Sequence, residues 1–342
     1  MQRKVLPDIL KGVAVILMIQ VHVMELFLLP EVYGSTFGKA SLFLGGIPAA
    51  PVFMSIMGYF AAYSHQSMYK QILRGLKLIL LGLLLNIGLN MHLLIRIWTG
   101  DLQIDPFAYI FGADILFVAG LSLIFVSILR ALSGRNIWVY LFFTVLIPLG
   151  SDLFPNDFML DGMQQYLMAF VISNADWSYF PFLPWAAWVL AGYSYALVEE
   201  RFGISEIIAK YSGWLIVILG IPLILSSHWA VKITTDLPRY YHHGLLFFLW
   251  GLAFMVIWIE LFRIMHRISR KNQIFGYFAW LGRNVTLAYV IQWLIIGNTA
   301  TAIFRTQPVW IYWISVLLVL LATTLLIILL ASPVRSLKNK LR

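Results

Sequence analysis

Apolar residues occur along the chain in long uninterrupted runs that do not alternate with polar residues. Each run is about 20 residues long, which is enough for an α-helix to cross a hydrocarbon layer of roughly 30 Å. Strands of a membrane barrel would alternate apolar and polar positions. With Gly, Pro and charge clusters as boundaries, the pattern predicts ten membrane spans: 8–29, 41–63, 72–93, 107–130, 136–154, 180–198, 210–227, 243–263, 276–297 and 308–331.

The composition agrees with this pattern. Hydrophobic residues make up 61% of the chain and charged residues 11%, whereas soluble domains contain about 45–50% and 25%. We therefore expect an all-α polytopic membrane protein with about ten transmembrane helices. No internal repeat or soluble segment interrupts the pattern, so residues 1–342 are interpreted as a single domain.

The distribution of cations predicts the orientation. With a cytoplasmic N-terminus, 18 of the 24 Lys and Arg residues lie on the inner side, five lie on the outer side, and Arg283 falls within the ninth span. The positive-inside rule then places both termini in the cytoplasm of a cell inner (plasma) membrane. The net charge of +9 is dispersed between apolar runs, so no nucleic-acid partner is expected. The absence of cysteine excludes disulfides and thiol nucleophiles.

The first span carries the most informative polar residues. Lys11 and His22 are eleven residues apart, so at 100° per residue they share a helix face, about 16 Å apart along the axis. Glu25 follows one turn after His22 and is placed to orient the imidazole. Ionisable groups at membrane depth are costly, which makes them candidates for function.

Structural interpretations of the same residues stay open. Lys11 can extend to lipid phosphates, and His22 can bond a neighbouring helix as a core histidine. Arg283 can pair with Asp114 of the fourth span or with Asp8. His242 and His243 point about 100° apart on a helix, which does not suit a shared metal ion, and no metal site is expected.

The longest outer connection, 155–179, is acidic. It contains Asp157, Asp161 and Asp176 and no Lys or Arg, and its segment Met163–Ile172 is apolar enough for a short interfacial helix. Long connections in compact folds often carry function. P-loop, G-x-G-x-x-G and G-x-S-x-G motifs are absent, which argues against nucleotide hydrolysis, dinucleotide binding and serine esterase chemistry.

Four segments resemble a known family of membrane enzymes. The residues Asp8-Ile9-Leu10-Lys11-Gly12, followed by the run to His22, resemble the first helix of acyltransferase family 3 proteins and their heparan-α-glucosaminide N-acetyltransferase-like relatives, in which Arg or Lys precedes His by the same spacing. Three further segments resemble parts of these proteins: 51–59, Leu183-Pro184-Trp185 with Gly192, and 281–289. Family 3 members often carry Arg-x-x-Ser on the third helix, whereas this chain has Arg74-Gly75-Leu76-Lys77.

The resemblance implies transfer of an acyl group, commonly acetyl, from cytoplasmic acetyl-CoA or another acyl-CoA to a hydroxyl or amine of a glycan or glycolipid acceptor on the far side. His22 would then be the general base, oriented by Glu25 or Asp114. An acyl-histidine intermediate remains an alternative. The basic residues expected to attract the donor phosphates are Lys11, Arg74, Lys77 and Arg283. The residues expected to receive the acceptor are Trp177, Tyr179, Trp185, His242 and His243.

Two other classes of protein remain as alternatives. A proton-coupled transporter would use Asp114, His22 and Arg283 as a relay, although no inverted repeat is visible. A noncatalytic scaffold or lipid-binding subunit would make the buried polar groups purely structural. Besides the bilayer and the acceptor, a second copy of the chain in a homodimer is the remaining expected partner.

Overall fold

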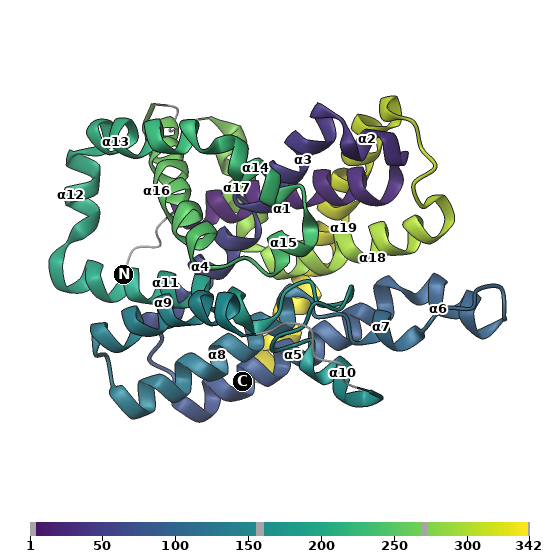
Figure 1. Ribbon diagram of the computed structural model, residues 1–342, viewed down its shortest axis with the longest axis horizontal. Coiled ribbons are helices and arrows are strands. Elements are labelled where there is room, and N and C mark those ends of the chain that lie inside the picture. The colour runs from purple at the N-terminus through teal and green to yellow at the C-terminus, as the bar shows by residue number, and fades with distance from the viewer. Residues whose placement is uncertain (1–4, 155–160, 269–271, 341–342) are drawn as a thin grey trace. The chain divides into compact units, whose positions relative to one another are not determined.

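The computed structural model describes residues 5–154, 161–268 and 272–340, with side chains as far as residue 331. Every regular element in these ranges is a helix (Figure 1). A single isolated bridge joins Leu28 to Gln307. The fold is therefore all-α, as the hydropathy pattern predicts.

Within the described ranges, seven helices are long and apolar enough to cross a membrane, and one bent pair would make eight. The chain is thus a polytopic membrane protein. The seven segments are Leu6–Phe27, Thr36–Ala62, Met68–Leu89, Ile115–Ser133, Leu245–Ile268, Val285–Ile303 and Val309–Ala331.

Three of the ten predicted spans correspond to helices that do not meet these criteria alone. The fifth is α9 (Ile137–Leu153), which has 17 residues and contains Pro148. The sixth is α11 (Phe182–Phe202), whose C-terminal end carries Glu199, Glu200 and Arg201. The seventh is the bent pair α12 (Ile204–Lys210) and α13 (Ser212–Leu225), which meet at 81°.

The ninth predicted span, 276–297, is not one helix. Helix α17 (Gln273–Arg283) is followed by Asn284, which caps it, and α18 (Val285–Ile303) begins at the next residue. The side-chain Nδ2 of Asn284 donates to the main-chain carbonyl of Trp280 at 2.9 Å. This local hydrogen bond competes with continued helix formation. Arg283 is therefore an exposed residue of the last turn of α17 and does not lie inside a span.

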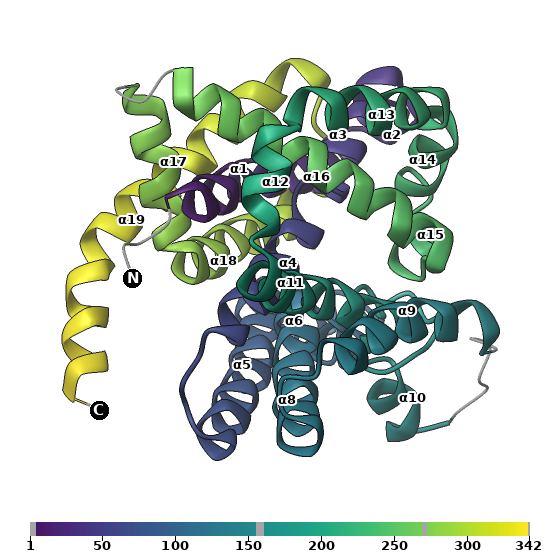
Figure 2. The ribbon, with the colours of Figure 1, turned by 90° about the vertical axis from the view of Figure 1, so that its left-hand side faces the viewer.

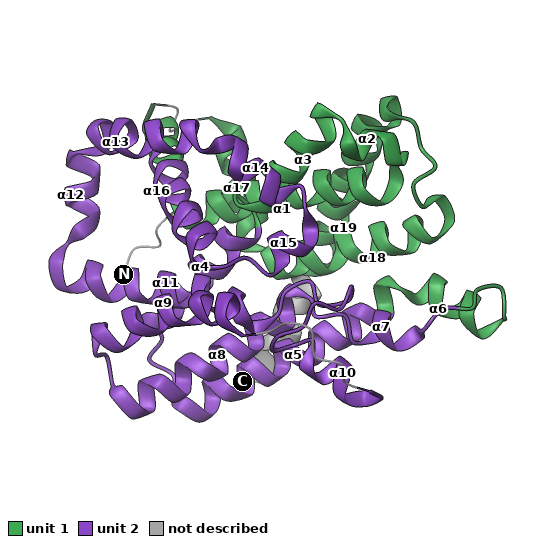
Figure 3. Cartoon of the chain, in the orientation of Figure 1, with its two compact units in different colours: residues 1–49, 88–103, 261–342 green, residues 50–87, 104–260 purple. Residues whose placement is uncertain are grey.

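The helices form two compact units, coloured separately in Figure 3. Unit 1 comprises residues 1–49, 88–103 and 261–342, and unit 2 comprises residues 50–87 and 104–260. Unit 1 contains α17, α18 and the end of α16. It also contains α1 (Leu6–Phe27), α2 (Pro30–Gly34), α3 (Thr36–Gly46), α6 (Met91–Trp98), the 3-10 turn Val309–Ile311 and α19 (Tyr312–Lys340). Unit 2 contains α9 and α11–α13. It also contains α4 (Ala50–Ala62), most of α5 (Met68–Leu89), α7 (Pro106–Ile110), α8 (Ile115–Ser133), α10 (Met163–Met168), α14 (Ser227–Thr234), α15 (Leu237–Tyr241) and most of α16 (Leu245–Ile268).

Helix α1 is the central helix of unit 1. It packs against α3, α17, α18 and α19, and Figure 2 shows it between α17 and α18. The contact with α17 is especially close because both helices present glycine: Gly282 of α17 lies against the main-chain oxygen of Asp8, where a Cβ would be only 1.8 Å away. This packing fixes the N-terminal half of α1.

Helix α11 has the same central place in unit 2, where it packs against α4, α8 and α9. Gly58 of α4 faces the carbonyl of Val189, and Gly192 of α11 faces the carbonyl of Ser55, each without room for a side chain. Trp185 and Trp188 are fully buried on α11. The Pro-Trp segment therefore forms the core of this unit.

Candidate functional site

The first polar group of α1 lies at its N-terminal end. The Nζ atom of Lys11 is 2.8 Å from Oδ1 of Asp8, one turn earlier, and Asp8 is buried. Arg283 follows Gly282, the residue that packs on the main chain of Asp8. The structure thus brings two of the four predicted donor-binding cations, Lys11 and Arg283, to the same end of unit 1.

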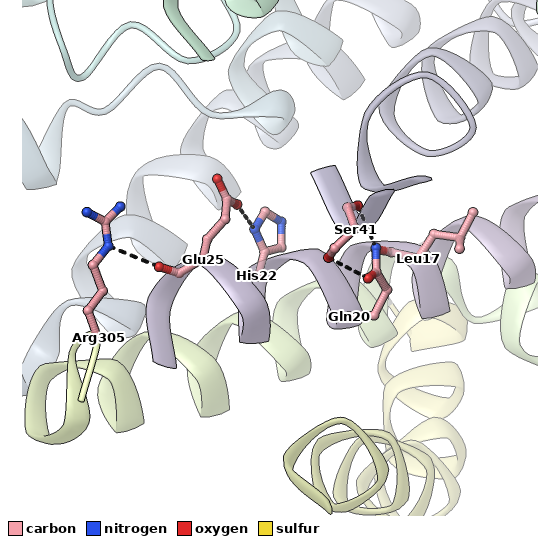
Figure 4. A network of polar contacts seen from close by, with 6 residues as sticks. All are labelled: Leu17, Gln20, His22, Glu25, Ser41 and Arg305. Carbon is pink, nitrogen blue, oxygen red and sulfur yellow. Dashed lines mark hydrogen bonds and ion pairs between the residues drawn. The ribbon is translucent and has the colours of Figure 1, made fainter. Parts of the chain in front are cut away.

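The second polar group lies eleven residues further along the same unbroken helix. Nδ1 of His22 lies 3.4 Å from Oε2 of Glu25 (Figure 4), and both side chains keep a small exposed fraction of 20% and 12%. The predicted pair is therefore formed. Nδ1 is the ring nitrogen nearer the carboxylate, which leaves Nε2 as the candidate basic nitrogen.

An indole from α18 covers the His22 ring. The ring centroids of His22 and Trp293 are 4.2 Å apart and the planes are tilted by 39°. The Nε1 atom of Trp293 is buried and has no hydrogen-bond partner among the described residues. Trp293 is not predictable from sequence, because nothing in its local pattern links it to a histidine 271 positions earlier.

The C-terminal end of α1 is held by the segment that follows α18. Nε of Arg305 donates to the main-chain carbonyl of Glu25 at 3.2 Å (Figure 4). The main-chain nitrogens of Arg305 and Gln307 donate to the carbonyls of Leu26 and Phe27 at 2.9 and 2.8 Å. Arg305 adopts a φ of +53°, a conformation that is uncommon for residues with a side chain. Arg305 is likewise not among the site residues predicted from sequence.

A saturated network fixes α1 two residues before His22. Gln20 accepts hydrogen bonds at its Oε1 from the hydroxyls of Ser41 and Tyr312, both at 2.7 Å. Its Nε2 donates to the carbonyls of Leu17 and Ser41 (Figure 4). Since every polar atom of the Gln20 side chain is used, we interpret this residue as a structural link between α1, α3 and α19.

The other two predicted donor-binding cations belong to unit 2. Arg74 and Lys77 are exposed, three residues apart on α5. Between them, Gly75 packs against the carbonyl of Gly120 in α8. The two cations therefore lie close to each other on the outside of the helix, as their spacing predicts.

Asp114 does not lie inside a span, contrary to the expectation from hydropathy. It is the N-cap residue of α8, and its Oδ1 accepts a hydrogen bond from the main-chain nitrogen of Ile115 at 2.6 Å. Capping explains its position directly, because aspartate satisfies the free N–H groups at the start of a helix. An aspartate immediately before an apolar run is also a sequence signal for a helix start.

Part of the acidic connection lies beside Asp114. The neighbouring residue Ala113 exchanges two main-chain hydrogen bonds of 2.7 Å with Trp177 and Phe180. Tyr179 is 40% exposed, and the ring of Trp177 packs 5.3 Å from that of Tyr166. The predicted segment contains a short helix, α10 (Met163–Met168), whereas Asp157 lies outside the described residues.

Three predicted acceptor residues lie in or beside the core of unit 2. Trp185 is fully buried and its Nε1 donates to the carbonyl of Tyr241 at 2.8 Å. His243 is 3% exposed; its Nε2 accepts from Nε1 of Trp188 at 3.2 Å, and its Nδ1 lies 2.8 Å from the carbonyl of Tyr240. Because an indole only donates, Nδ1 must carry the proton and the ring is neutral.

Burial lowers the pKa of His243 to about 4, and burial likewise lowers the pKa of its neighbour His242 to about 4. Both residues lie in the turn between α15 and α16, before the span that begins at Leu245. With both ring nitrogens engaged, His243 supports this turn and offers no free group to an acceptor. The described residues contain no group of three metal-ligating side chains.

Comparison with known proteins gives one match. The family model described as "Heparan-alpha-glucosaminide N-acetyltransferase, catalytic" matches residues 3–220, which include α1 with Lys11, His22 and Glu25. No curated protein and no solved structure matches the chain. The match covers well over half of the chain, so this protein belongs to the heparan-α-glucosaminide N-acetyltransferase catalytic family and is a membrane-embedded acyltransferase.

Proposed function

We propose that the protein transfers an acetyl or related acyl group from cytoplasmic acyl-CoA to a hydroxyl or amine of an extracytoplasmic glycan or glycolipid. The observation that carries this proposal is the arrangement of α1, with Lys11 at one end and the His22–Glu25 pair eleven residues further along. The helix spacing separates the two by about 16 Å along the axis. A donor with phosphates at one end and a thioester at the end of its pantetheine arm suits this separation.

On the donor side, positive charge attracts the phosphates of coenzyme A. Within unit 1, Lys11 and Arg283 supply this charge. Arg74 and Lys77 form a separate cationic pair within unit 2. Charge-assisted hydrogen bonds to phosphate oxygens are stronger than neutral ones. The Nζ atom of Lys11 lies 2.8 Å from Oδ1 of Asp8 and its side chain remains 15% exposed, so part of it is accessible to a phosphate.

On the acceptor side, Nε2 of His22 takes the proton of the acceptor hydroxyl or amine while the acceptor oxygen or nitrogen attacks the thioester carbonyl. The carbon–sulfur bond then breaks, and the coenzyme A thiolate leaves and is protonated. The carboxylate of Glu25 faces Nδ1 and stabilises the imidazolium formed during the transfer. No external oxidant or reductant is required.

Within unit 2, the exposed part of the acidic connection carries side chains of the kinds that bind sugars. Tyr179 presents a 40% exposed ring, and Asp114 lies next to Ala113, which binds this segment through its main chain. Aromatic faces pack on the apolar faces of sugar rings, and a carboxylate accepts hydrogen bonds from sugar hydroxyls. Trp185 and His243 contribute from the core by holding the adjacent turn in place.

The direct test is acyl-CoA consumption by the purified protein in lipid nanodiscs. Because the chain contains no cysteine, the coenzyme A thiol can be measured with a thiol reagent without background from the protein. We expect thiol release with acetyl-CoA that increases on addition of glucosamine, which offers an amine, or of glucose, which offers only hydroxyls. Proton-coupled uptake of a solute without any thiol release would instead favour a transporter.

A further inference from the structure

Helix α18 contributes to the His22 site although it lies beyond residues 3–220, which the family model matches. The indole of Trp293 lies against the imidazole, with ring centroids 4.2 Å apart. The side chain of His22 remains 20% exposed. The indole therefore covers part of the His22 ring while part of the side chain stays accessible.

The contact to Glu25 does not by itself fix the His22 ring. At 3.4 Å, the distance between Nδ1 and Oε2 is long for a hydrogen bond, so this contact restrains the ring less than a short hydrogen bond would. A flat aromatic surface against the imidazole restricts rotation of the ring about its side-chain bonds. Aromatic pairs of this kind contribute about 0.5–1.5 kcal/mol beyond their buried area.

The polar atom of Trp293 does not explain its presence. Buried indole N–H groups usually have a hydrogen-bond partner, but Nε1 of Trp293 is buried and has none among the described residues. A residue needed only to fill space would not introduce an unpaired donor. What the indole provides at this position is its ring surface.

We propose that Trp293 is a positioning residue for acyl transfer, which holds the His22 imidazole so that Nε2 faces the acceptor. This inference rests on the proposed role of His22 as the general base. The ring face also stabilises the imidazolium that forms when His22 takes the proton, because a cation is attracted to the face of an indole. Residue 293 therefore acts on the rate of transfer and not on binding of the donor.

The test compares Trp293→Phe, which keeps a flat ring and removes the N–H group, with Trp293→Met, which fills the space without a flat face. We expect Trp293→Met to lower kcat roughly tenfold, equivalent to about 1.4 kcal/mol, with the KM for acetyl-CoA within twofold of wild type. Trp293→Phe should keep kcat within about threefold. The control is Trp310→Leu, since Trp310 is 67% exposed in the same unit, and it should behave as wild type.

Unchanged kcat in Trp293→Met would overturn the proposal. An equal loss in the Phe and Met variants would also overturn it, because the ring surface would then not be the relevant property. A loss carried by KM would assign Trp293 to donor binding and contradict it as well. Variants are compared only if they melt within a few degrees of wild type. If Trp293→Met melts at a lower temperature than this, Trp293→Leu takes its place.

A second measurement does not depend on acyl transfer. Carbethoxylation of His22, followed by peptide mass spectrometry with the exposed His65 as internal reference, reports how freely the imidazole reacts. We expect His22 to react several times faster in Trp293→Met and at the wild-type rate in Trp293→Phe. Equal rates in all three proteins would overturn the positioning role. A faster rate in a protein that shows no acyl transfer would refute the proposed function and leave the positioning role supported.

Discussion

Gly12 of α1 faces the main-chain carbonyl of Phe278 in α17 so closely that a Cβ at position 12 would lie 1.9 Å from that oxygen. The two helices therefore approach each other backbone to backbone, next to the Asp8–Lys11 pair. Because main-chain atoms cannot rotate away as a side chain can, any larger residue must separate the helices.

We expect Gly12→Ala to destabilise the protein by roughly 1–3 kcal/mol, the usual cost of overpacking. Thermal unfolding in nanodiscs would measure this change. The matched control is Gly276→Ala on α17, where nothing lies within 4 Å of the added methyl group; it should be neutral or slightly stabilising, because alanine favours helix. Equal effects of the two substitutions would contradict the described packing.

The donor proposal predicts that Lys11→Ala weakens binding of coenzyme A. Loss of one charge-assisted contact corresponds to roughly a tenfold increase in Kd, measurable by isothermal titration. Lys11→Arg keeps the charge and should bind normally. Lys39→Ala removes an exposed lysine of α3 and should leave the affinity unchanged. If Lys11→Ala binds as tightly as wild type, Lys11 serves only to pair with Asp8.

The buried turn at His243 predicts a dependence of stability on pH. Burial lowers the pKa of His243 to about 4, below the ordinary value of about 6.5 for histidine. Between these values the unfolded chain binds a proton that the folded chain does not, so stability falls as pH falls from about 6.5 to 4. His243→Gln retains a donor for Tyr240 and an acceptor for Trp188.

The melting temperature of His243→Gln should therefore decrease less than that of wild type between pH 7 and pH 5. The decrease that remains in this variant includes the contribution of His242, whose pKa is also lowered by burial. If the melting temperatures of wild type and His243→Gln fell equally over this pH range, protonation of His243 would carry no cost in the folded state and the prediction would be wrong.

The cation distribution predicts that both termini are cytoplasmic and that the acidic connection is outside. Single cysteines test this cleanly in a chain that has none. In intact cells, an impermeant maleimide should label Asp161→Cys, whereas Ser336→Cys should react only after the membrane is permeabilised. Labelling of position 336 in intact cells would reverse the predicted orientation.

The features that sequence predicts correctly are those that depend on local periodicity. The helical class and the pairing of His22 with Glu25 follow from hydropathy and from spacing along one helix. The capping role of Asp114 was also readable, because the residue directly precedes an apolar run, but the hydropathy boundaries placed it inside a span.

The remaining features depend on contacts between distant segments. The Trp188–His243 bond joins residues 55 positions apart, and the approach of Trp293 to His22 joins the first helix to α18. A single sequence contains no signal for such pairs. The break at Asn284 is local, yet an asparagine inside an apolar run is compatible with a continuous helix, and only its bond to Trp280 shows where α17 ends.

The most direct test of the central claim is acyl transfer by His22→Gln in nanodiscs, with His65→Gln, at an exposed position, as control. Glutamine keeps much of the size and hydrogen-bonding capacity of histidine but cannot act as a base. We expect His22→Gln to melt near the wild-type temperature, to bind coenzyme A normally and to transfer acetyl groups at least about a hundredfold more slowly. Transfer by His22→Gln at the wild-type rate would show that His22 is a structural residue and that the chemistry lies elsewhere.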